Sequence, residues 1–291
     1  MAVTGRYISE QIRLQVTYVT AYSKCVLEDL LPAFGNMEER ADKIADEEFN
    51  RLGEQPANED FDGDMSDIAE QATAHGQAFF DTMVALQQTT INLFAAGLFH
   101  LVEQQLAEVC HDRSFTILVP ALDDTDIDVV ADWYERHLGL SLRQLRTWSK
   151  IFELKCVANA VKHAEGSSAE KLRKIRPELF QHPWLREIVP RSRWWRDAPL
   201  RSPLAGDDFY ITKERFAAYA VVAEQFFDEI AAHFEKNPAE YYPVDGELLN
   251  QAQFLAFAGF ARMPGCGISS SFSFTCSPRL HDSPVLAVFV L

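Results

Sequence analysis

Residues Lys155–Phe180 read KCVANAVKHAEGSSAEKLRKIRPELF, and the helical signals of the chain are clearest in this stretch. Lys155, Asn159 and Lys162 recur at steps of four and three, and His163 follows directly, so that on an α-helix these side chains share one face. Apolar residues flank the polar ones. The pattern therefore predicts a helix with a polar stripe near its C-terminal end.

The residues after His163 predict a second helix close behind the first. Gly166 indicates the end of the first helix, because glycine adopts the left-handed C′ conformation at little cost. Ser167, with Glu170 three residues later, matches a capping box, in which two side chains satisfy free N–H groups at the start of a helix. Pro177 ends the second helix, since proline lacks an N–H and clashes with the preceding turn.

Similar periodicity predicts helices over most of the chain. We expect them at residues 7–34, 37–52, 66–109, 127–138 and 141–164, with a final helix that Thr212 caps and that ends near Lys236. At about 1.5 Å per residue, the helix over 66–109 would span on the order of 60 Å and form the spine of a bundle. Residues 114–121 fit either a short buried strand or an apolar linker.

These patterns predict a mainly α protein, a bundle of about six helices with one long spine helix. We expect a single helical-bundle domain over residues 1–240. Residues 241–291 lose the periodicity and predict an irregular or partly disordered C-terminal extension. Between residues 181 and 208, prolines and tryptophans alternate with arginines, which predicts an irregular loop.

The net charge of −16 argues by itself against a nucleic-acid-binding protein, but the charges are unevenly distributed. From Arg143 to Arg201 there are 14 Lys and Arg against 6 Asp and Glu, whereas the rest of the chain holds 13 against 37. Two interpretations follow. Either the basic segment packs against the acidic first half of the chain, or it contacts phosphate groups of a partner.

Cysteine content, apolar runs and the absence of known motifs narrow the class of protein further. Five scattered cysteines without a CxxC pair indicate reduced thiols in a cytoplasmic protein. No apolar run is long enough for a membrane helix, so we expect no membrane association. The sequence has neither zinc-ligand spacing nor a nucleotide-binding glycine motif, so we expect no metal and no other cofactor.

The segment NAVKH (Asn159–His163), followed by AEGSSAEKLRKIRPELF, resembles the signature region of the HEPN superfamily of helical proteins. The motif of that family is an Arg, often followed by Asn, and then a His after four to six residues, on a helix of an α bundle. Asn159 and His163 fit the Asn and the His, while Ala158 stands where the Arg is expected. Residues 207–231 are loosely similar to the final helix of bacterial proteins with such a segment, which places a HEPN-like core at about 66–236.

The resemblance implies a metal-independent endoribonuclease of a bacterial defence or toxin–antitoxin system, because many HEPN proteins are RNases that act as dimers. His163 and Asn159 would then be catalytic, with His163 assisting attack of the ribose 2′-OH on the adjacent phosphate. The RNA phosphates would be held by nearby basic side chains: Lys155, Lys162, Arg173, Arg176, Arg193 and Arg196.

Ala158 supports a second hypothesis, because alanine cannot offer a phosphate the planar set of donors that arginine does. The chain would then be a non-catalytic helical interaction or scaffold protein, such as a dimer partner or an antitoxin. We expect a homodimer, or a protein partner that contacts the acidic half. An exposed His163 in a basic cleft would favour the RNase, and a buried His163 hydrogen-bonded between helices would favour the scaffold.

Overall fold

The computed structural model of the chain describes residues 3–54, 65–111, 122, 124–188, 199–201, 203, 208–237, 240–244 and 247–250. These residues are mainly helical, as the sequence predicts. Six of the helices that they form are 12 residues or longer, and they pack as a bundle. Residues 114–121, predicted as a strand or a linker, lie outside the described residues, as does most of the predicted loop at 181–208.

The elements follow one another along the chain in this order: β1 (Val3–Thr4), α1 (Gly5–Lys24), the π-helix η1 (Cys25–Leu30), the 3-10 helix η2 (Leu31–Phe34), α2 (Met37–Gly53), α3 (Met65–His111), α5 (Ile127–Leu138), the 3-10 helix η3 (Leu142–Gln144), α6 (Trp148–His163), α7 (Ser167–Ile175), the 3-10 helix η4 (Pro177–Phe180), α8 (Pro183–Ile188), α9 (Lys213–Lys236), β2 (Glu240–Val244) and β3 (Glu247–Asn250).

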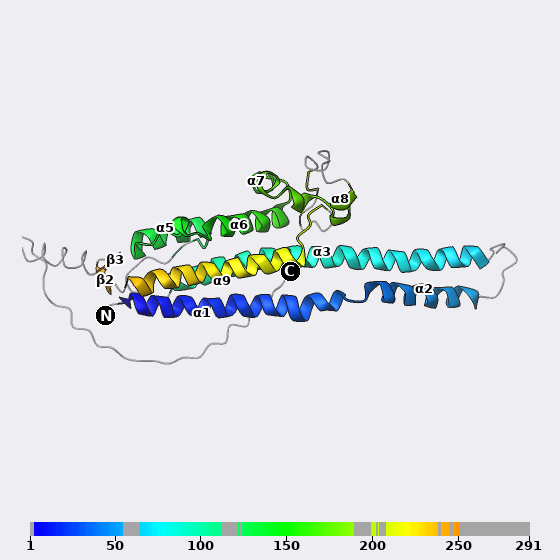
Figure 1. Cartoon of the computed structure of the whole chain (residues 1–291), viewed down its shortest axis with the longest axis horizontal. Helices are drawn as coiled ribbons and strands as arrows, with labels where there is room; N and C mark the ends of the chain where they lie inside the picture. Colours follow the sequence, from blue (N-terminus) through cyan, green and yellow to red (C-terminus); the bar gives the residue numbers. More distant parts are fainter. Residues whose placement is uncertain are drawn as a thin grey trace, which may run out of the picture.

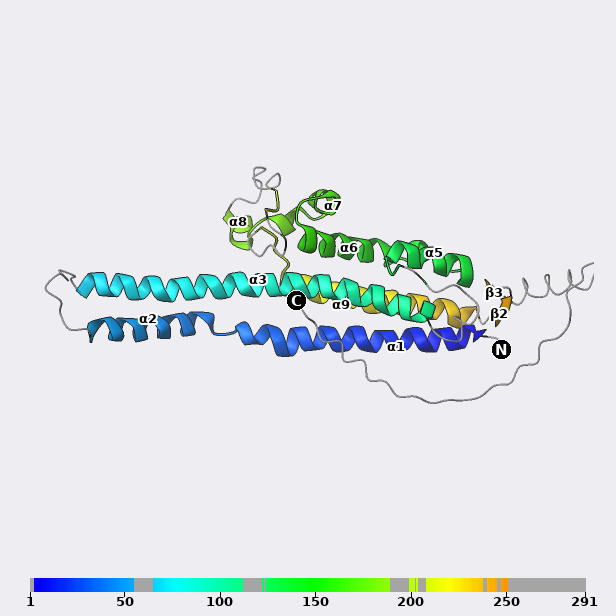
Figure 2. The same cartoon turned by 180° about the vertical axis from the view of Figure 1, so that it is seen from behind.

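Helix α3 is the predicted spine. Its 47 residues correspond to a length of about 70 Å at 1.5 Å per residue. The C-terminal half of α3 packs in the bundle against α1, α6 and α9, whereas the N-terminal half projects beyond the bundle with α2 beside it (Figures 1 and 2). We call α2 together with residues 65–83 of α3 the arm.

The core is one continuous cluster that runs from Ile8 in α1 to Phe234 in α9. Helices α1 and α9 lie side by side next to α3, and α5 and α6 form a second layer above them (Figure 1). The largest fully buried side chains are aromatic and come from α3, α5, the segment before α9, and α9 itself: Phe99, Tyr134, Phe209, Phe216, Phe226, Phe227 and Phe234.

Two glycines of α3 mark places where another group approaches the helix closely. A Cβ atom on Gly76 would lie 2.7 Å from the carbonyl oxygen of Ala41 in α2, and one on Gly97 would lie 2.4 Å from the hydroxyl of Tyr22 in α1. These separations are shorter than van der Waals contact. A side chain at Gly76 would push α2 away, whereas one at Gly97 would displace the side chain of Tyr22.

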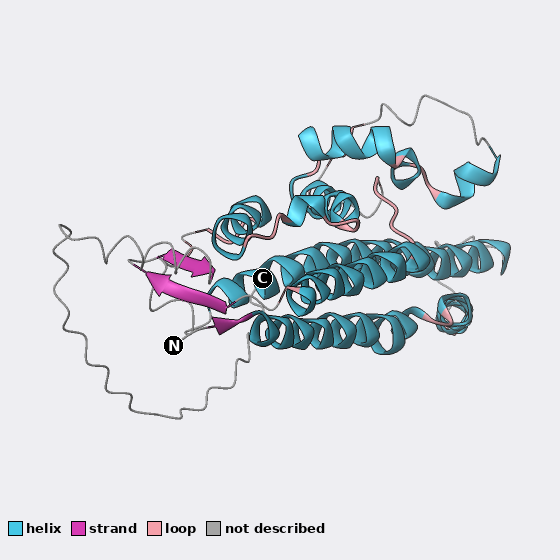
Figure 3. Ribbon diagram, turned by 60° about the vertical axis from the view of Figure 1, so that its left-hand side comes forward, coloured by secondary structure: helices cyan, strands magenta, loops and turns pink. Residues whose placement is uncertain are grey.

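A three-stranded antiparallel sheet closes the end of the bundle where α1 begins and α9 ends (Figure 3). Strand β1 pairs with β2, which pairs with β3. The prediction that the chain is irregular from residue 241 onward is therefore wrong for these strands. Strand β2 forms four residue pairs with the adjacent β3 and two with Val3–Thr4. The second contact is long-range, and local periodicity does not reveal it. Residues 251–291 of the predicted extension lie outside the described residues.

Both ends of α6 differ from the prediction. Its regular part begins at Trp148, after the separate turn η3, and not at Ser141. At the C-terminal end the positive φ falls on Ala164 (φ 59°), whereas Gly166 is extended (φ 164°). Gly166 is itself the N-cap of α7 and has no side chain to accept a hydrogen bond. The N-cap of α7 thus lies one residue before the predicted one, and the predicted capping box of Ser167 and Glu170 does not form.

Among the described residues, none of the helices is both long enough and apolar enough to cross a membrane.

Candidate functional site on helix α6

The last two turns of α6 carry the residues that the sequence singles out as catalytic. Asn159 is half-buried, and Lys162 and His163 are exposed. The side chains of Asn159 and His163 form no hydrogen bond with any other residue that the structure describes. The imidazole of His163 is thus open to solvent, as a catalytic or a ligand-binding histidine would need.

Ala158, which stands where the resemblance to HEPN proteins leads us to expect an arginine, is completely buried in the core cluster. Its side chain therefore points in a different direction from the exposed side chain of His163. A longer cationic side chain at this position would enter the apolar interior and not the surface on which His163 lies.

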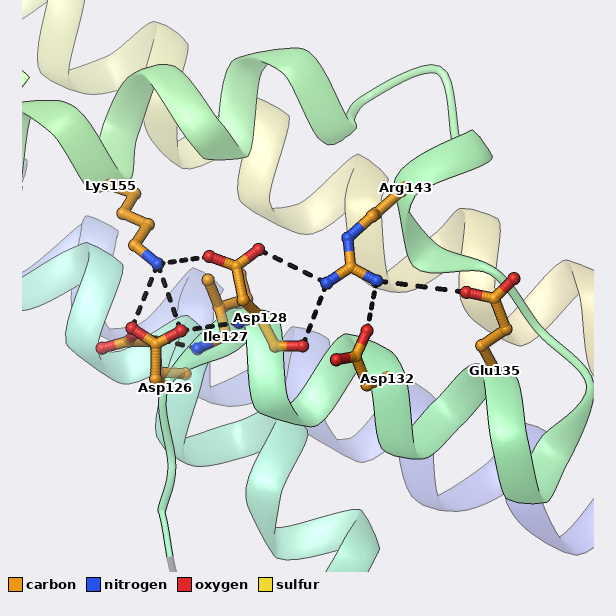
Figure 4. A network of polar contacts seen from close by, with 8 residues as sticks. Asp126, Ile127, Asp128, Asp132, Glu135, Arg143 and Lys155 are labelled. Carbon is orange, nitrogen blue, oxygen red and sulfur yellow. Dashed lines mark hydrogen bonds and ion pairs between the residues drawn. The ribbon is translucent and has the colours of Figure 1, made fainter.

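Lys155 forms ion pairs with two carboxylates at the start of α5. Its Nζ lies 3.0 Å from Oδ2 of Asp126 and 2.8 Å from Oδ2 of Asp128 (Figure 4). Asp126 is also the N-cap of α5, with its carboxylate accepting from the N–H of Asp128 at 2.8 Å. The hydrogen bond from Lys155 lowers the pKa of Asp128, since it stabilises the ionised carboxylate. Lys155 therefore fastens α6 to α5.

Arg143 extends this network along α5. Its guanidinium nitrogens lie 2.6 Å from a carboxylate oxygen of Asp132, 3.6 Å from one of Asp128 and 4.0 Å from one of Glu135 (Figure 4). It also donates to the backbone carbonyl of Asp128 at 3.1 Å. The carboxylates of α5 and of the loop before it therefore form ion pairs with Arg143, the first basic residue of the segment, and with Lys155.

Lys162 forms a polar chain with α3. Its Nζ lies 3.2 Å from Nε2 of His100, and Nδ1 of His100 lies 2.9 Å from Oε2 of Glu103. Glu103 also accepts from the N–H of Ile127 at 3.3 Å. Along the sequence, only Glu103 lies near His100, and Lys162 is 62 positions away. For this reason the sequence analysis did not identify His100 as a neighbour of the site.

Arg173 forms a bidentate pair with Glu165, with N–O distances of 2.5 and 2.6 Å. Its guanidinium also lies over the ring of Phe180, 4.7 Å from the centroid. The hydrogen bonds from Arg173 lower the pKa of Glu165. The second oxygen of this carboxylate accepts from the N–H of Leu200 at 3.0 Å, so the pair fixes the α6–α7 junction to the chain before α9.

Arg176 joins a buried carboxylate on α6. Glu153 accepts hydrogen bonds from Arg176 at 2.7 Å, from the hydroxyl of Tyr219 at 2.9 Å and from Lys150 at 3.1 Å. Burial raises the pKa of Glu153, but the three donors more than offset this effect, so its pKa is lowered. Sequence reasoning missed Glu153 because its partners on α7 and α9 are distant along the chain.

Each described candidate cation except Lys162 is thus bound by a carboxylate of the same chain, and Lys162 contacts His100. Arg193 and Arg196 lie outside the described residues. In the part of the chain that the structure describes, no group of three or more His, Cys, Asp or Glu side chains is arranged to hold a metal ion. Among the described residues of this site, Asn159, His163 and the Lys162–His100–Glu103 chain are the groups that no carboxylate of a neighbouring helix ties up in an ion pair.

No protein-family model, curated protein or solved structure matches this chain.

Proposed function

We propose that the chain is a non-catalytic helical interaction protein. The observation that carries this proposal is the ion pairing of its candidate phosphate-binding residues. Lys155, Arg173 and Arg176 each lie within 3.0 Å of a carboxylate that the fold supplies. A phosphate would have to displace these carboxylates, and breaking a partly buried pair leaves an uncompensated charge behind.

The burial of Ala158 supports the same conclusion. A HEPN RNase uses its arginine to stabilise charge on the scissile phosphate, and here that position belongs to the core. The basic segment instead joins α6 and α7 to α5 and α9 through the pairs described above. The charge excess between Arg143 and Arg201 therefore fits internal packing better than it fits RNA binding.

An RNA-cleavage assay tests the proposal. The full-length protein would be incubated in EDTA with a labelled single-stranded RNA that contains every dinucleotide step, beside His163→Ala purified in the same way. We expect no cleavage above that of the variant. Lys174→Ala, which alters an exposed lysine without a partner among the described residues, serves as the matched control. EDTA-insensitive cleavage that leaves a 2′,3′-cyclic phosphate and is lost only in His163→Ala would overturn the proposal.

The same assay decides the second candidate, a metal-independent endoribonuclease. The exposure of His163 beside Lys162 favours that activity, because a general acid or base must be able to reach the substrate from the surface. In this case expression of the wild-type protein would also slow growth of a bacterial host, and Asn159→Ala and His163→Ala would each relieve the effect.

A further inference from the structure

Most of the apolar surface of the arm has no partner among the residues that the structure describes. Two helices that touch along one line bury only one stripe of each, and here that stripe consists mostly of small residues. Ala41 is the buried residue of α2, and Ile68, Ala72 and Gly76 are those of residues 65–83 in α3. A stable helical assembly buries a wider apolar face than this.

The larger apolar side chains of the arm are half-buried or exposed, and three of them line the concave edges between the two helices: Ile44, Phe79 and Phe80. Apart from Ile68, none of those in the described part of the arm is buried. They are Met37, Ile44, Phe49, Leu52, Met65, Phe79, Phe80 and Met83. Such an edge is completed when a third helix packs into the groove between two others.

A groove with a volume of about 460 Å³ runs along one edge of the arm, and we call it the acidic groove. Ala41, Ala45 and Gly76 line it where α2 and α3 lie closest, and Phe80 contributes the largest apolar side chain. Thr73 and Gln77 of α3 are also among its lining residues.

Charge decides what can fill the groove. Glu38, Asp42 and Asp46 lie along α2 at steps of four, and none of them forms an ion pair with the described residues. On the opposite edge the carboxylates are paired, Glu47 with Lys43 and Glu48 with Arg51. The acidic groove is therefore the edge whose negative charge is still unbalanced.

A second copy of the chain is a poor occupant. The arm holds nine acidic residues against three basic ones, and the α3 part of it contains no Lys or Arg. Two arms side by side would place like charges against each other, which disfavours that pairing. The complementary surface is a helix with basic side chains at steps of three or four beside an apolar stripe.

We propose that the acidic groove of the arm binds a basic amphipathic helix of a partner protein. The helix would lie between α2 and α3 as the third member of a bundle, with its apolar stripe on Phe80 and its Lys or Arg side chains along Glu38, Asp42 and Asp46. The inference deepens the proposed function and rests on it, since it states the partner class that an interaction protein of this shape would take.

A synthetic peptide tests the proposal by fluorescence anisotropy against the full-length protein. The probe is a capped amphipathic helix of about 20 residues, long enough to be helical on binding, with lysines at steps of four on both sides of an Ala/Leu stripe. A matched peptide carries glutamine at every lysine position. We expect the lysine peptide to bind at least about tenfold more tightly than the glutamine peptide, with a preference that weakens as salt is raised.

Matched variants separate the groove from the general charge of the arm. Asp42→Lys with Asp46→Lys should abolish binding of the lysine peptide and create binding of a glutamate peptide. Asp67→Lys with Glu70→Lys changes the charge of the arm equally, outside the residues that line the groove, and should leave most of the binding intact. Phe80→Ala should weaken binding more than Phe79→Ala, because Phe79 lies on the opposite edge.

Several outcomes overturn the inference: no binding of the lysine peptide, equal loss in both charge-reversal variants, or sedimentation that shows dimerisation through the arm. A variant that lacks residues 251–291 tests whether the chain fills its own groove, and a large gain in peptide affinity on truncation would also overturn the inference. If peptide binding fails and RNA is not cleaved, the partner assignment fails while the proposed function stands. If RNA is cleaved, the proposed function fails whatever the peptide does.

Discussion

Arg176 lies against Glu153, with Nε 2.7 Å from Oε1, so that a residue whose sequence context suggests RNA binding instead joins two helices. Tyr219 of α9 donates to the same oxygen at 2.9 Å. Glu153 is thus the point at which α6, the end of α7 and α9 meet. Its side chain is 5% exposed, so the ion pair is largely shielded from water and from salt.

Glu153→Ala should therefore destabilise the bundle strongly. Removing one partner of a buried pair leaves Arg176 and Tyr219 without their acceptor, a change that costs about 3–5 kcal/mol in comparable cases. Urea unfolding followed by far-ultraviolet circular dichroism measures the effect. Glu170→Ala removes an exposed carboxylate of α7 and should change stability very little. Equal midpoints for the two variants would contradict the role assigned to Glu153.

The fold was largely predictable from the sequence, because helix periodicity is a local property. The spine helix, α5 with its stop at Gly139, and α9 with its Thr212 cap lie within two residues of the predicted bounds. The end of α6 was not predictable in detail, since Ala164 adopts a positive φ that the sequence would assign to glycine. Ala164 is buried in that conformation, and no residue pattern at the end of α6 indicates it.

The candidate site was predictable only in part. The exposure of His163 follows from its place at the end of an amphipathic helix. The partners of the basic residues do not follow, because Lys155 pairs with a carboxylate 27 positions away and Glu153 accepts from a tyrosine 66 positions away. Counting charges along the sequence indicates an excess of positive charge, and only the fold shows which carboxylates balance it.

Acid should weaken the contact between α5 and α6. Because the pKa of Asp128 is lowered in the folded protein, its pair with Lys155 adds stability above the pKa of the unfolded carboxyl, about 3.9. That contribution is lost as the pH falls through the lower folded value. The stability difference between the wild type and Lys155→Met should therefore be full at pH 7 and shrink below about pH 4.

Urea unfolding of both proteins at a series of pH values measures this difference. Lys174→Met is the matched control, since it removes an exposed lysine without a partner among the described residues. A difference between the wild type and Lys155→Met that stays constant down to the acid limit would show that Lys155 acts through packing of its aliphatic chain and not through its charge.

Gly76→Ala should open the arm without unfolding the bundle. The new Cβ would lie 2.7 Å from the carbonyl oxygen of Ala41 and 3.0 Å from Cβ of Ala45, so α2 must move away from α3. Overpacking of this kind costs about 1–3 kcal/mol. Hydrogen exchange should therefore become faster in residues 37–53 and 65–83 and remain slow in α9. Gly166→Ala, where the added Cβ meets no atom within 4 Å, should leave exchange in the arm unchanged.

Ala158→Arg tests the HEPN resemblance most directly, because it restores the arginine of the motif. If Asn159 and His163 formed an RNase site that lacks only this residue, the substitution would create or raise RNA cleavage. Ala158 is 0% exposed, however, and an arginine there would bury a charge among apolar side chains. We expect a loss of stability of more than about 4 kcal/mol and no cleavage.

Asn159→Arg places the same side chain one residue later on a half-exposed position and should fold normally. A folded Ala158→Arg protein that cleaves RNA in EDTA, while Asn159→Arg does not, would show that the surface around His163 is a catalytic site after all.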